Sequence, residues 1–337
     1  MEVFENYDLT KLNTFGVSVS AKFFVEIKRE LDLKELFLSP EFKNNEKFFL
    51  GGGSNVLFTK DFDGIVILNK LQGIEVLEEN SESILIKSMS GEVWHTLVSF
   101  AVDRGYWGIE NLSLIPGTVG AAPVQNIGAY GAELQNVIES VEAYQISDGL
   151  KKVFSKSECE FGYRDSIFKN KLKGKYFISA ITLKLSKIEQ KNISYKVLKE
   201  YLEKNKIEIK NSKNISNAVA EIRRSKLPDP ALIPNAGSFF KNIFVEKEKF
   251  QGLLAIYPNM PYFKEKEVIK IPSAWLIEEC GWKGKRIGKV GVHEHHALVL
   301  VNYGGGTGEE IKNLAEKIKD SVFQKFGLQL IPEVNLI

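Results

Sequence analysis

The chain has 337 residues, more than one typical domain, and its 44% hydrophobic and 26% charged residues are ordinary for a globular protein. Its 45 basic and 43 acidic residues leave a formal charge of +2, so no global field attracts nucleic acid or a membrane surface. The first residues lack a signal-peptide pattern and no apolar run approaches a membrane span, which indicates a cytoplasmic protein. Cys159 and Cys280 match no metal or redox spacing and fit free thiols.

The first 70 residues predict short strands around a glycine turn, Gly51-Gly52-Gly53-Ser54-Asn55. A Rossmann fingerprint is excluded, because Val56 and a strand-like run follow where a third glycine and a helix are required. A Walker phosphate loop is excluded too, since no Gly-Lys-Ser/Thr follows. The glycine turn therefore indicates phosphate binding of another type. The other predicted elements here are a helix over 31–38 and strands over 21–28, 47–50, 56–59 and 64–69.

A hairpin over 74–76 and 84–88 is followed by a predicted helix whose apolar residues recur from Val93 to Ala101. Ser90 is the expected N-cap, and Gly105 the expected end. His95 lies in this helix with no partner within helical reach, which favours a packed or surface histidine over a catalyst.

Residues 115–131 form a glycine-rich loop in which glycine, alanine and proline crowd together with no charged side chain. Glycine lets backbone approach a ligand closely, and exposed N–H groups in such turns bind phosphates. An ordinary tight loop is the alternative, but the length of the segment and its Gln125, Asn126 and Tyr130 favour a loop that holds a cofactor.

Strands are predicted over 140–146, 151–154 and 176–185, and Tyr163-Arg164-Asp165 lies between the last two. The guanidinium of Arg164 suits an anion clamp, although this stretch by itself favours an Arg–Asp surface pair. Residues 186–214 are rich in lysine and asparagine and are expected to be a linker or flexible insertion. Ser216 is the expected cap of a helix over 218–226, which Pro228 ends.

The C-terminal third contains several polar candidates. Ser238 is not in a nucleophile elbow, so hydrolase chemistry is not indicated. After a short helix over 272–280, the basic run 283–289 suits a diphosphate, with a solvated loop as the alternative. His293, His295 and His296 suggest a metal site only weakly, because a following strand over 297–301 would separate the last two.

The last 31 residues read as a helix followed by a strand. Thr307 and Glu310 predict a capping box, and Gly327 predicts the end of the helix. The final strand over 328–336 places Glu333 among apolar neighbours, where a carboxylate requires a partner or a function.

Taken in order, these segments resemble the UDP-N-acetylenolpyruvoylglucosamine reductase family, and specifically its subgroup with a tyrosine loop. The resemblance runs nearly end to end. The matching segments are Asn13–Gly16, Gly51–Leu57, Ile115–Gly131, Phe161–Phe168, Lys226–Pro230, Asn235–Asn242 and Pro332–Val334.

The resemblance implies an α+β fold. It comprises an FAD-binding fold of the vanillyl-alcohol oxidase (PCMH) type in two subdomains and a C-terminal α+β substrate-binding domain. The expected boundaries are 1–70 with 328–337 returning to it, 71–214 including Tyr195, and 215–327 for the substrate. It also implies UDP-N-acetylmuramate dehydrogenase activity in peptidoglycan synthesis, noncovalent FAD, NADPH as co-substrate, UDP-N-acetylglucosamine enolpyruvate as substrate, and a monomer. No metal, nucleic acid or membrane partner is expected.

The family's catalytic positions fall on Arg164, Ser238 and Glu333. By resemblance, NADPH reduces FAD and leaves, and hydride then passes from flavin N5 to the terminal enolpyruvyl carbon. Arg164 and Glu333 would polarise the substrate carboxylate, and Ser238 would protonate the carbanion. Because the three come from distant segments, the site is expected at a domain junction.

The binding positions carry over by the same resemblance. FAD contacts are expected at Gly51, Gly52, Gly53, Ser54, Asn55, Pro116, Gly117, Gly120, Ala121, Gln125, Asn126, Gly128, Ala129 and Tyr130. Substrate contacts are expected at Tyr163, Tyr195, Lys226, Asn242, Lys283 and His296. Two departures from the family pattern stand out: His296 replaces an expected glutamine, and Asn335 replaces a basic residue.

Two other classes of function remain open at this stage. One is a flavoprotein oxidase or dehydrogenase of the same fold, which has no need of a serine proton donor. The other is a non-catalytic nucleotide-sugar or flavin-binding protein.

Overall fold

The computed structural model describes residues 1–265 and 267–337, which form two compact units. Unit 1 comprises Met1–Tyr7, Ala21–Gly52 and Phe62–Ser225, and unit 2 comprises Asp8–Ser20, Gly53–Asp61 and Lys226–Ile337. The chain therefore contributes to each unit from three separate segments. The predicted division into three domains at residues 70, 214 and 327 stays a prediction.

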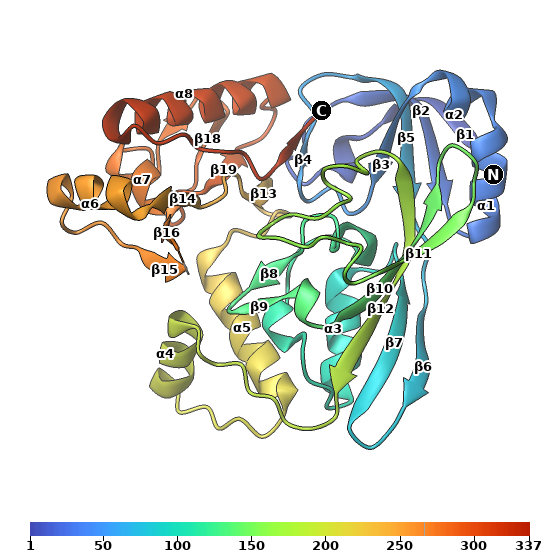
Figure 1. The fold of residues 1–337 in the computed structure, drawn as a ribbon. Coiled ribbons are helices and arrows are strands. Elements are labelled where there is room, and N and C mark those ends of the chain that lie inside the picture. The colour runs from blue at the N-terminus through green and yellow to red at the C-terminus, as the bar shows by residue number, and fades with distance from the viewer. Residues whose placement is uncertain (266) are drawn as a thin grey trace. The chain divides into compact units, whose positions relative to one another are not determined.

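The first layer of unit 1 is a four-stranded sheet with the order β1-β2-β5-β3 (Figure 1). Strand β5 runs parallel to both β2 and β3, and strands buried on both faces read as continuous apolar runs, as in Ile65–Leu68. Two helices pack on this sheet through Leu33, Leu36 and Phe42. The elements are β1 (Val3–Asp8), β2 (Ser20–Ile27), α1 (Glu30–Leu38), α2 (Pro40–Asn44), β3 (Glu46–Leu50) and β5 (Phe62–Asn69).

The second layer of unit 1 is a five-stranded antiparallel sheet with the order β11-β10-β12-β7-β6. Helix α3 (Trp94–Asp103) packs against it with Trp94, Leu97 and Val98, which are buried with the sheet residues. The indole Nε1 of Trp94 donates to the Leu112 carbonyl at 2.9 Å, so the buried indole is satisfied. The strands are β6 (Ile74–Glu79), β7 (Ser83–Met89), β10 (Ile138–Gln145), β11 (Lys151–Ser155) and β12 (Tyr176–Ser186).

Two helices of unit 1 correct the expectations for residues 186–226. Helix α4 (Lys196–Lys204) lies where a linker was predicted, and Leu198 and Leu202 on it pack with Ile215 and Val219 of α5. Helix α5 (Ser212–Lys226) begins earlier than predicted, so Ser216 is inside the helix rather than its cap. Leu198 and Leu202 lie one turn apart and bury one face of α4, with Val197 and Tyr201 partly buried beside them. The other residues of the helix are charged.

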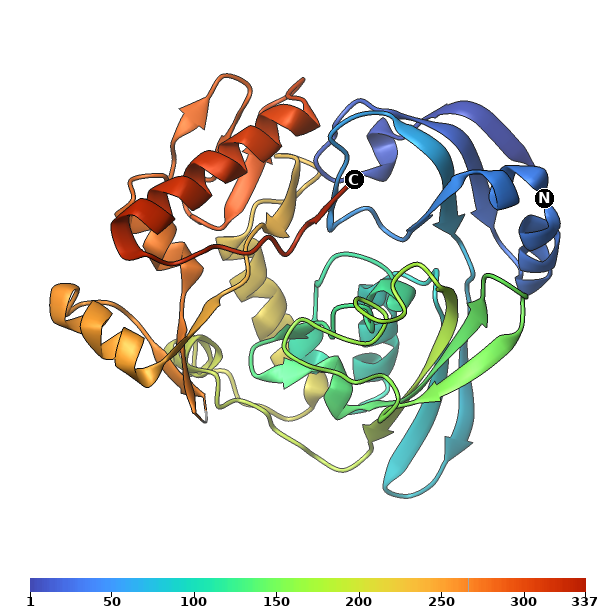
Figure 2. The same cartoon turned by 45° about the horizontal axis from the view of Figure 1, so that its top comes forward.

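Unit 2 contains three sheets with the orders β13-β19-β18-β17, β14-β16-β15 and β20-β4. Helix α8 (Gly308–Phe326) lies along β18 and β19 in both views (Figures 1 and 2). The other elements are β4 (Val56–Leu57), β13 (Asn235–Ser238), β14 (Ile243–Glu246), α6 (Lys247–Ile256), β15 (Phe263–Glu265), β16 (Val268–Ile271), α7 (Ser273–Glu279), β17 (Arg286–Ile287), β18 (Val290–Val292), β19 (Val299–Asn302) and β20 (Asn335–Leu336).

Short elements connect these layers in both units. The strands β8 (Gly128–Ala129) and β9 (Ala132–Glu133) form a small hairpin in unit 1. The 3₁₀ turns cover Thr10–Leu12, Glu110–Leu112, Val119–Ala121 and Leu134–Asn136. No helix in residues 1–265 or 267–337 combines the length and apolar character needed to cross a bilayer.

The predicted helix ends have mixed outcomes. The capping box of Thr307 and Glu310 is confirmed, and so is the end of α8 at Gly327, which has φ +63°. The predicted cap at Ser90 is wrong, because Val93 precedes α3 and provides no side-chain cap. The final strand is shorter than predicted: only Asn335–Leu336 pairs as a strand, parallel to Val56–Leu57.

We predict that Thr307→Ala lowers the free energy of unfolding by about 1 kcal/mol. Thr307 Oγ1 accepts a hydrogen bond from the Glu310 N–H, and the methyl group of alanine cannot accept one. Urea unfolding followed by circular dichroism measures the change. Thr96→Ala in α3 is the control, since Thr96 makes no capping bond and the change should stay within about 0.5 kcal/mol. Equal effects of the two substitutions would contradict the prediction.

Candidate active site

In unit 1, the start of the glycine turn lies against the start of the glycine-rich loop. A Cβ on Gly52 would lie 3.0 Å from the Gly117 Cα, and a Cβ on Gly51 would lie 2.5 Å from Thr118 Oγ1. The loop is held in place by α3, since the N–H of Trp94 donates to the Gly117 carbonyl at 3.0 Å. Only glycine allows two backbones to approach this closely.

Several backbone N–H groups of these two segments lack an acceptor. Of the backbone bonds that the structure describes for residues 1–265 and 267–337, none is donated by the N–H of Gly52, Gly53, Ser54, Gly117 or Thr118. In each unit the turn contains a glycine with positive φ, Gly117 at +118° in unit 1 and Gly53 at +64° in unit 2. Glycine turns of this kind can expose successive N–H groups as a concavity. Such concavities bind phosphate oxygens, so Gly52, Gly117 and Thr118 of unit 1 suit a phosphate group of a dinucleotide cofactor.

Strained backbone concentrates around the glycine-rich loop. Seven non-glycine residues in the described chain have positive φ, and four of them are Leu114, Asn126, Tyr130 and Arg164. Residues held in this conformation cluster at functional sites, where the surrounding structure maintains the strain. Asn126 is fully buried and maintains part of it, because its amide donates to Glu133 Oε2 and the Gly162 carbonyl, both at 3.0 Å.

Arg164 lies in a tight turn that Gly162 and Asp165 close through reciprocal backbone bonds. Its Nη2 donates to the Gly128 carbonyl at 2.5 Å, and its guanidinium lies 5.5 Å from the centroid of the Tyr163 ring. A Cβ on Gly128 would lie 2.7 Å from Arg164 Nη1, so glycine at 128 makes room for the guanidinium. The structure thus brings Arg164, Tyr163 and Gly128 of the predicted site together.

Tyr195 and Tyr130 form an edge-to-face pair with ring centroids 5.5 Å apart. The segment before Tyr195 is tied to the glycine-rich loop by two amides that sequence reasoning missed. Asn111 Nδ2 donates to the carbonyls of Tyr130 and Asn192 at 2.8 and 2.9 Å, and Asn192 Nδ2 donates to the Gly131 carbonyl at 3.1 Å. Neither asparagine stands in a recognisable motif, so only the three-dimensional structure reveals them.

In unit 2, the structure brings Ser238 and Glu333 together. The Glu333 N–H donates to the carbonyl of Phe239, the residue next to Ser238, at 2.8 Å. Asn55 joins this group, because its Nδ2 donates to the Glu333 carbonyl at 3.3 Å. Phe239 and Phe240 are buried and anchor the segment that carries Ser238.

A buried asparagine shapes the turn before Ser238. Asn235 Nδ2 donates to the Ile233 carbonyl at 2.8 Å, and its Oδ1 accepts from the Gly237 N–H at 2.8 Å. Gly237 has φ +68°, and the register between β13 and β19 shifts between Asn235 and Ser238. Irregular strand ends of this kind redirect a side chain next to active sites.

The predicted substrate residues of unit 2 include a cationic group around His296. Burial, then the charges of His293, Lys226 and Lys283, lower the pKa of His296. Its Nδ1 accepts from the Leu298 N–H at 3.3 Å, so the neutral ring carries its proton on Nε2. An Nε2–H donor can replace the amide N–H of the glutamine expected here.

The other substrate and departure residues of unit 2 make defined contacts. Asn242 Oδ1 accepts from the Ser273 N–H at 3.1 Å, and Lys283 pairs with Glu278 at 2.9 Å. Asn335 Nδ2 donates to the Asn55 carbonyl at 3.0 Å and so fixes the glycine turn. Among the residues that the structure describes, no cluster of three or more potential metal ligands occurs.

The predicted site residues divide between the two units along the chain. Gly51, Gly52, all predicted loop residues from Pro116 to Tyr130, Tyr163, Arg164 and Tyr195 belong to unit 1. Gly53, Ser54, Asn55, Lys226, Ser238, Asn242, Lys283, His296 and Glu333 belong to unit 2.

Family models match two parts of the chain. Residues 21–152 match an FAD binding domain, and residues 229–337 match the C-terminal domain of UDP-N-acetylenolpyruvoylglucosamine reductase. The reductase of Amoebophilus asiaticus is 49% identical to this chain, and that of Flavobacterium johnsoniae is 45% identical, each over 100% of both chains. The chain belongs to the UDP-N-acetylenolpyruvoylglucosamine reductase family.

Membership of the reductase family settles the class of protein. The chain is an FAD-dependent oxidoreductase, so the alternative of a non-catalytic binding protein is set aside. The crystal structure of a family member from Thermus caldophilus covers 99% of this chain and 98% of its own, with 22% identity and a TM-score of 0.68. The predicted α+β class with an FAD-binding fold of the vanillyl-alcohol oxidase type is confirmed.

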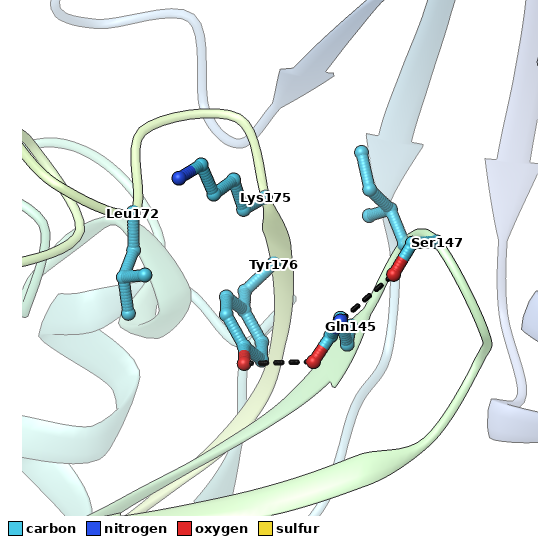
Figure 3. A pocket seen from close by; sticks show the side chains of 6 residues that line it. Gln145, Ser147, Leu172, Lys175 and Tyr176 are labelled. Carbon is cyan, nitrogen blue, oxygen red and sulfur yellow. Dashed lines mark hydrogen bonds between the residues drawn. The ribbon is translucent and has the colours of Figure 1, made fainter.

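A separate pocket of about 350 Å³ opens in unit 1 of this reductase-family chain (Figure 3). Its lining includes Leu172, Lys175 and Tyr176, none of which is a predicted site residue. The Tyr176 hydroxyl donates to Gln145 Oε1 at 3.0 Å, and Gln145 Nε2 donates to Ser147 Oγ at 2.8 Å. The pocket thus contains none of the predicted site residues.

We predict that Gly53→Ala weakens FAD binding at least about tenfold, which corresponds to about 1.4 kcal/mol. The new Cβ would lie 1.9 Å from the Leu12 carbonyl oxygen, so the glycine turn must move. The dissociation constant of FAD, measured by flavin fluorescence quenching, tests this.

Gly174→Ala is the matched control for this prediction. Gly174 also has positive φ, +71°, but a Cβ there meets no atom within 4 Å. The control therefore carries the same backbone strain without the collision. Equal loss of FAD in both variants would show that strain, rather than the close approach at Gly53, causes the effect.

Proposed function

We propose that this chain reduces UDP-N-acetylglucosamine enolpyruvate to UDP-N-acetylmuramate, the reaction that its relatives' names and the sequence motifs support. In this proposal the hydride derives from NADPH and reaches the terminal carbon of the enolpyruvyl group from N5 of bound FAD. The hydrogen-bonded pairing of the segments carrying Ser238 and Glu333 is the observation that supports it most directly.

We assign the proton to Ser238. Hydride addition leaves negative charge on the carbon next to the substrate carboxylate, and one proton at that carbon completes the reduction. A serine hydroxyl is a weak acid, so it donates only to a base as strong as this carbanion. The irregular end of β13 presents Ser238 partly exposed, as a donor to a bound ligand must be.

We assign stabilisation of the developing charge to Arg164 and Glu333. A guanidinium can bind both oxygens of the substrate carboxylate and draw electron density toward them. The left-handed backbone of Arg164 and its bond to Gly128 fix the guanidinium before substrate binds, which lowers the reorganisation needed during reaction.

The remaining assignments follow the same proposal. Tyr163, Tyr195, Lys226, Asn242, Lys283 and His296 hold the sugar nucleotide, and cationic side chains suit its diphosphate. FAD is held noncovalently by the glycine turn and the glycine-rich loop. We further propose that the enzyme is a cytoplasmic monomer that supplies peptidoglycan precursors.

We predict that Ser238→Ala still accepts hydride from NADPH but fails to form product at a normal rate. Anaerobic stopped-flow absorbance at the flavin band tests this, with NADPH added first and the enolpyruvyl substrate second. Bleaching should proceed as in the wild type, and recovery should slow by about 10²–10⁴-fold, the usual contribution of general acid catalysis.

The control for this experiment is Ser321→Ala on α8, where Oγ donates to the Lys317 carbonyl. That variant should bleach and recover like the wild type. Recovery of Ser238→Ala at the wild-type rate would sink the assigned role of Ser238. Bleaching of the wild type without recovery would point to a flavoprotein with another electron acceptor.

A further inference from the structure

Leu114, just before the glycine-rich loop, is held by side chains at both its N–H and its carbonyl. Its φ of +54° is unfavourable for a leucine. The Leu114 N–H donates to His95 Nδ1 at 3.2 Å, and Arg223 Nε donates to the Leu114 carbonyl at 3.2 Å. Neither side chain is among the catalytic or binding residues assigned above.

The two side chains come from helices that are fixed to the same stretch of chain. His95 lies in the first turn of α3, whose Trp94 N–H also holds the Gly117 carbonyl at 3.0 Å. Arg223 lies on α5, which is joined to Ser113 by a 2.7 Å bond between the hydroxyls of Ser113 and Ser216. The start of the loop is therefore fixed at Ser113, Leu114 and Gly117.

We propose that His95 and Arg223 are positioning residues that hold Leu114 in its left-handed conformation and thereby fix the glycine-rich loop in its FAD-binding form. The inference rests on the proposed role of that loop in FAD binding. It assigns no contact between these two residues and the cofactor. Their effect on FAD affinity passes through the backbone of residues 114–117.

The hydrogen bond from the Leu114 N–H to His95 makes the conformation of Leu114 sensitive to pH. Nδ1 accepts a hydrogen bond only while the ring is neutral, because imidazolium carries N–H groups at both nitrogens. Burial, then the charges of Arg224 and Arg223, lower the pKa of His95 from its ordinary 6.5. Because the pKa of His95 is lowered in the folded protein, the bond from the Leu114 N–H to His95 Nδ1 contributes its full stabilisation above pH 6.5. That contribution declines as pH falls below 6.5 and His95 becomes protonated.

The test compares FAD dissociation constants of the wild type, His95→Leu and His95→Asn from about pH 5 to pH 8, a range that spans the ordinary histidine pKa. Asparagine places Oδ1 where Nδ1 lies and accepts a hydrogen bond at every pH, whereas leucine cannot accept one. At pH 8 we expect His95→Leu to bind FAD about tenfold more weakly and His95→Asn to bind it like the wild type. Below pH 6.5 the wild type should lose affinity and His95→Asn should lose less.

The exposed His295 supplies the matched control, since His295→Asn removes a histidine that lies far along the chain from Leu114. Its pH profile should match the wild type. The inference is overturned if His95→Leu binds FAD like the wild type at pH 8, or if His95→Asn and the wild type have the same profile.

Two further variants test the inference if His95→Leu fails to fold and separate it from the proposed function. Arg224→Gln removes a surface charge that lowers the pKa of His95, so the loss of FAD affinity should begin at higher pH even if His95→Leu fails to fold. An unchanged profile would overturn the inference. Gly53→Ala separates it from the proposed function: if that variant loses FAD while His95→Leu retains it, only the inference fails. If both retain FAD, the proposed cofactor site fails.

Discussion

The close approach of two backbones, at Gly51-Gly52 and Gly117-Thr118, is the constraint on which the cofactor-binding part of unit 1 depends. A Cβ on Gly52 would press on the Gly117 backbone at 3.0 Å, and a Cβ on Gly51 would require the Thr118 side chain to move. The approach also leaves N–H groups without protein acceptors, which a folded chain tolerates where a ligand or water supplies them. The same close approach thus costs free energy on folding, and it exposes the N–H groups on which the proposed binding of phosphate depends.

Strained backbone and side-chain hydrogen bonds occur together in this region. Leu114, Asn126, Tyr130 and Arg164 adopt unfavourable backbone conformations, and each lies in a segment that side-chain hydrogen bonds hold in place. Polar side chains thus hold this part of the backbone in place, as apolar packing does elsewhere in the protein. Because a hydrogen bond has direction, it can fix a peptide in one rotation, which packing alone does poorly.

Much of this architecture was predictable from local chemistry. Alternating or continuous apolar runs located most strands of unit 1, whereas β13 to β18 of unit 2 were not predicted. Thr307 with Glu310 located the start of α8. The motifs also led to Ser238 and Glu333, which the structure places on paired segments. The sequence did not reveal α4, because the burial of Leu198 and Leu202, with Val197 and Tyr201 beside them, depends on α5, and the remaining residues of α4 are charged. Asn111, His95 and Arg223 were missed because their partners are distant backbone groups that carry no sequence signature.

The anchoring of the segment before Tyr195 has an entropic consequence. A flexible insertion would lose conformational freedom each time it closed over a ligand, and that loss would be subtracted from the binding free energy. Here α4 is already packed against α5, and Asn111 and Asn192 already fix the backbone beside Tyr195. The backbone beside Tyr195 is therefore already ordered, while the tyrosine ring itself is exposed. The ordering cost of this segment is met during folding, by leucines and amides that are not among the proposed substrate contacts.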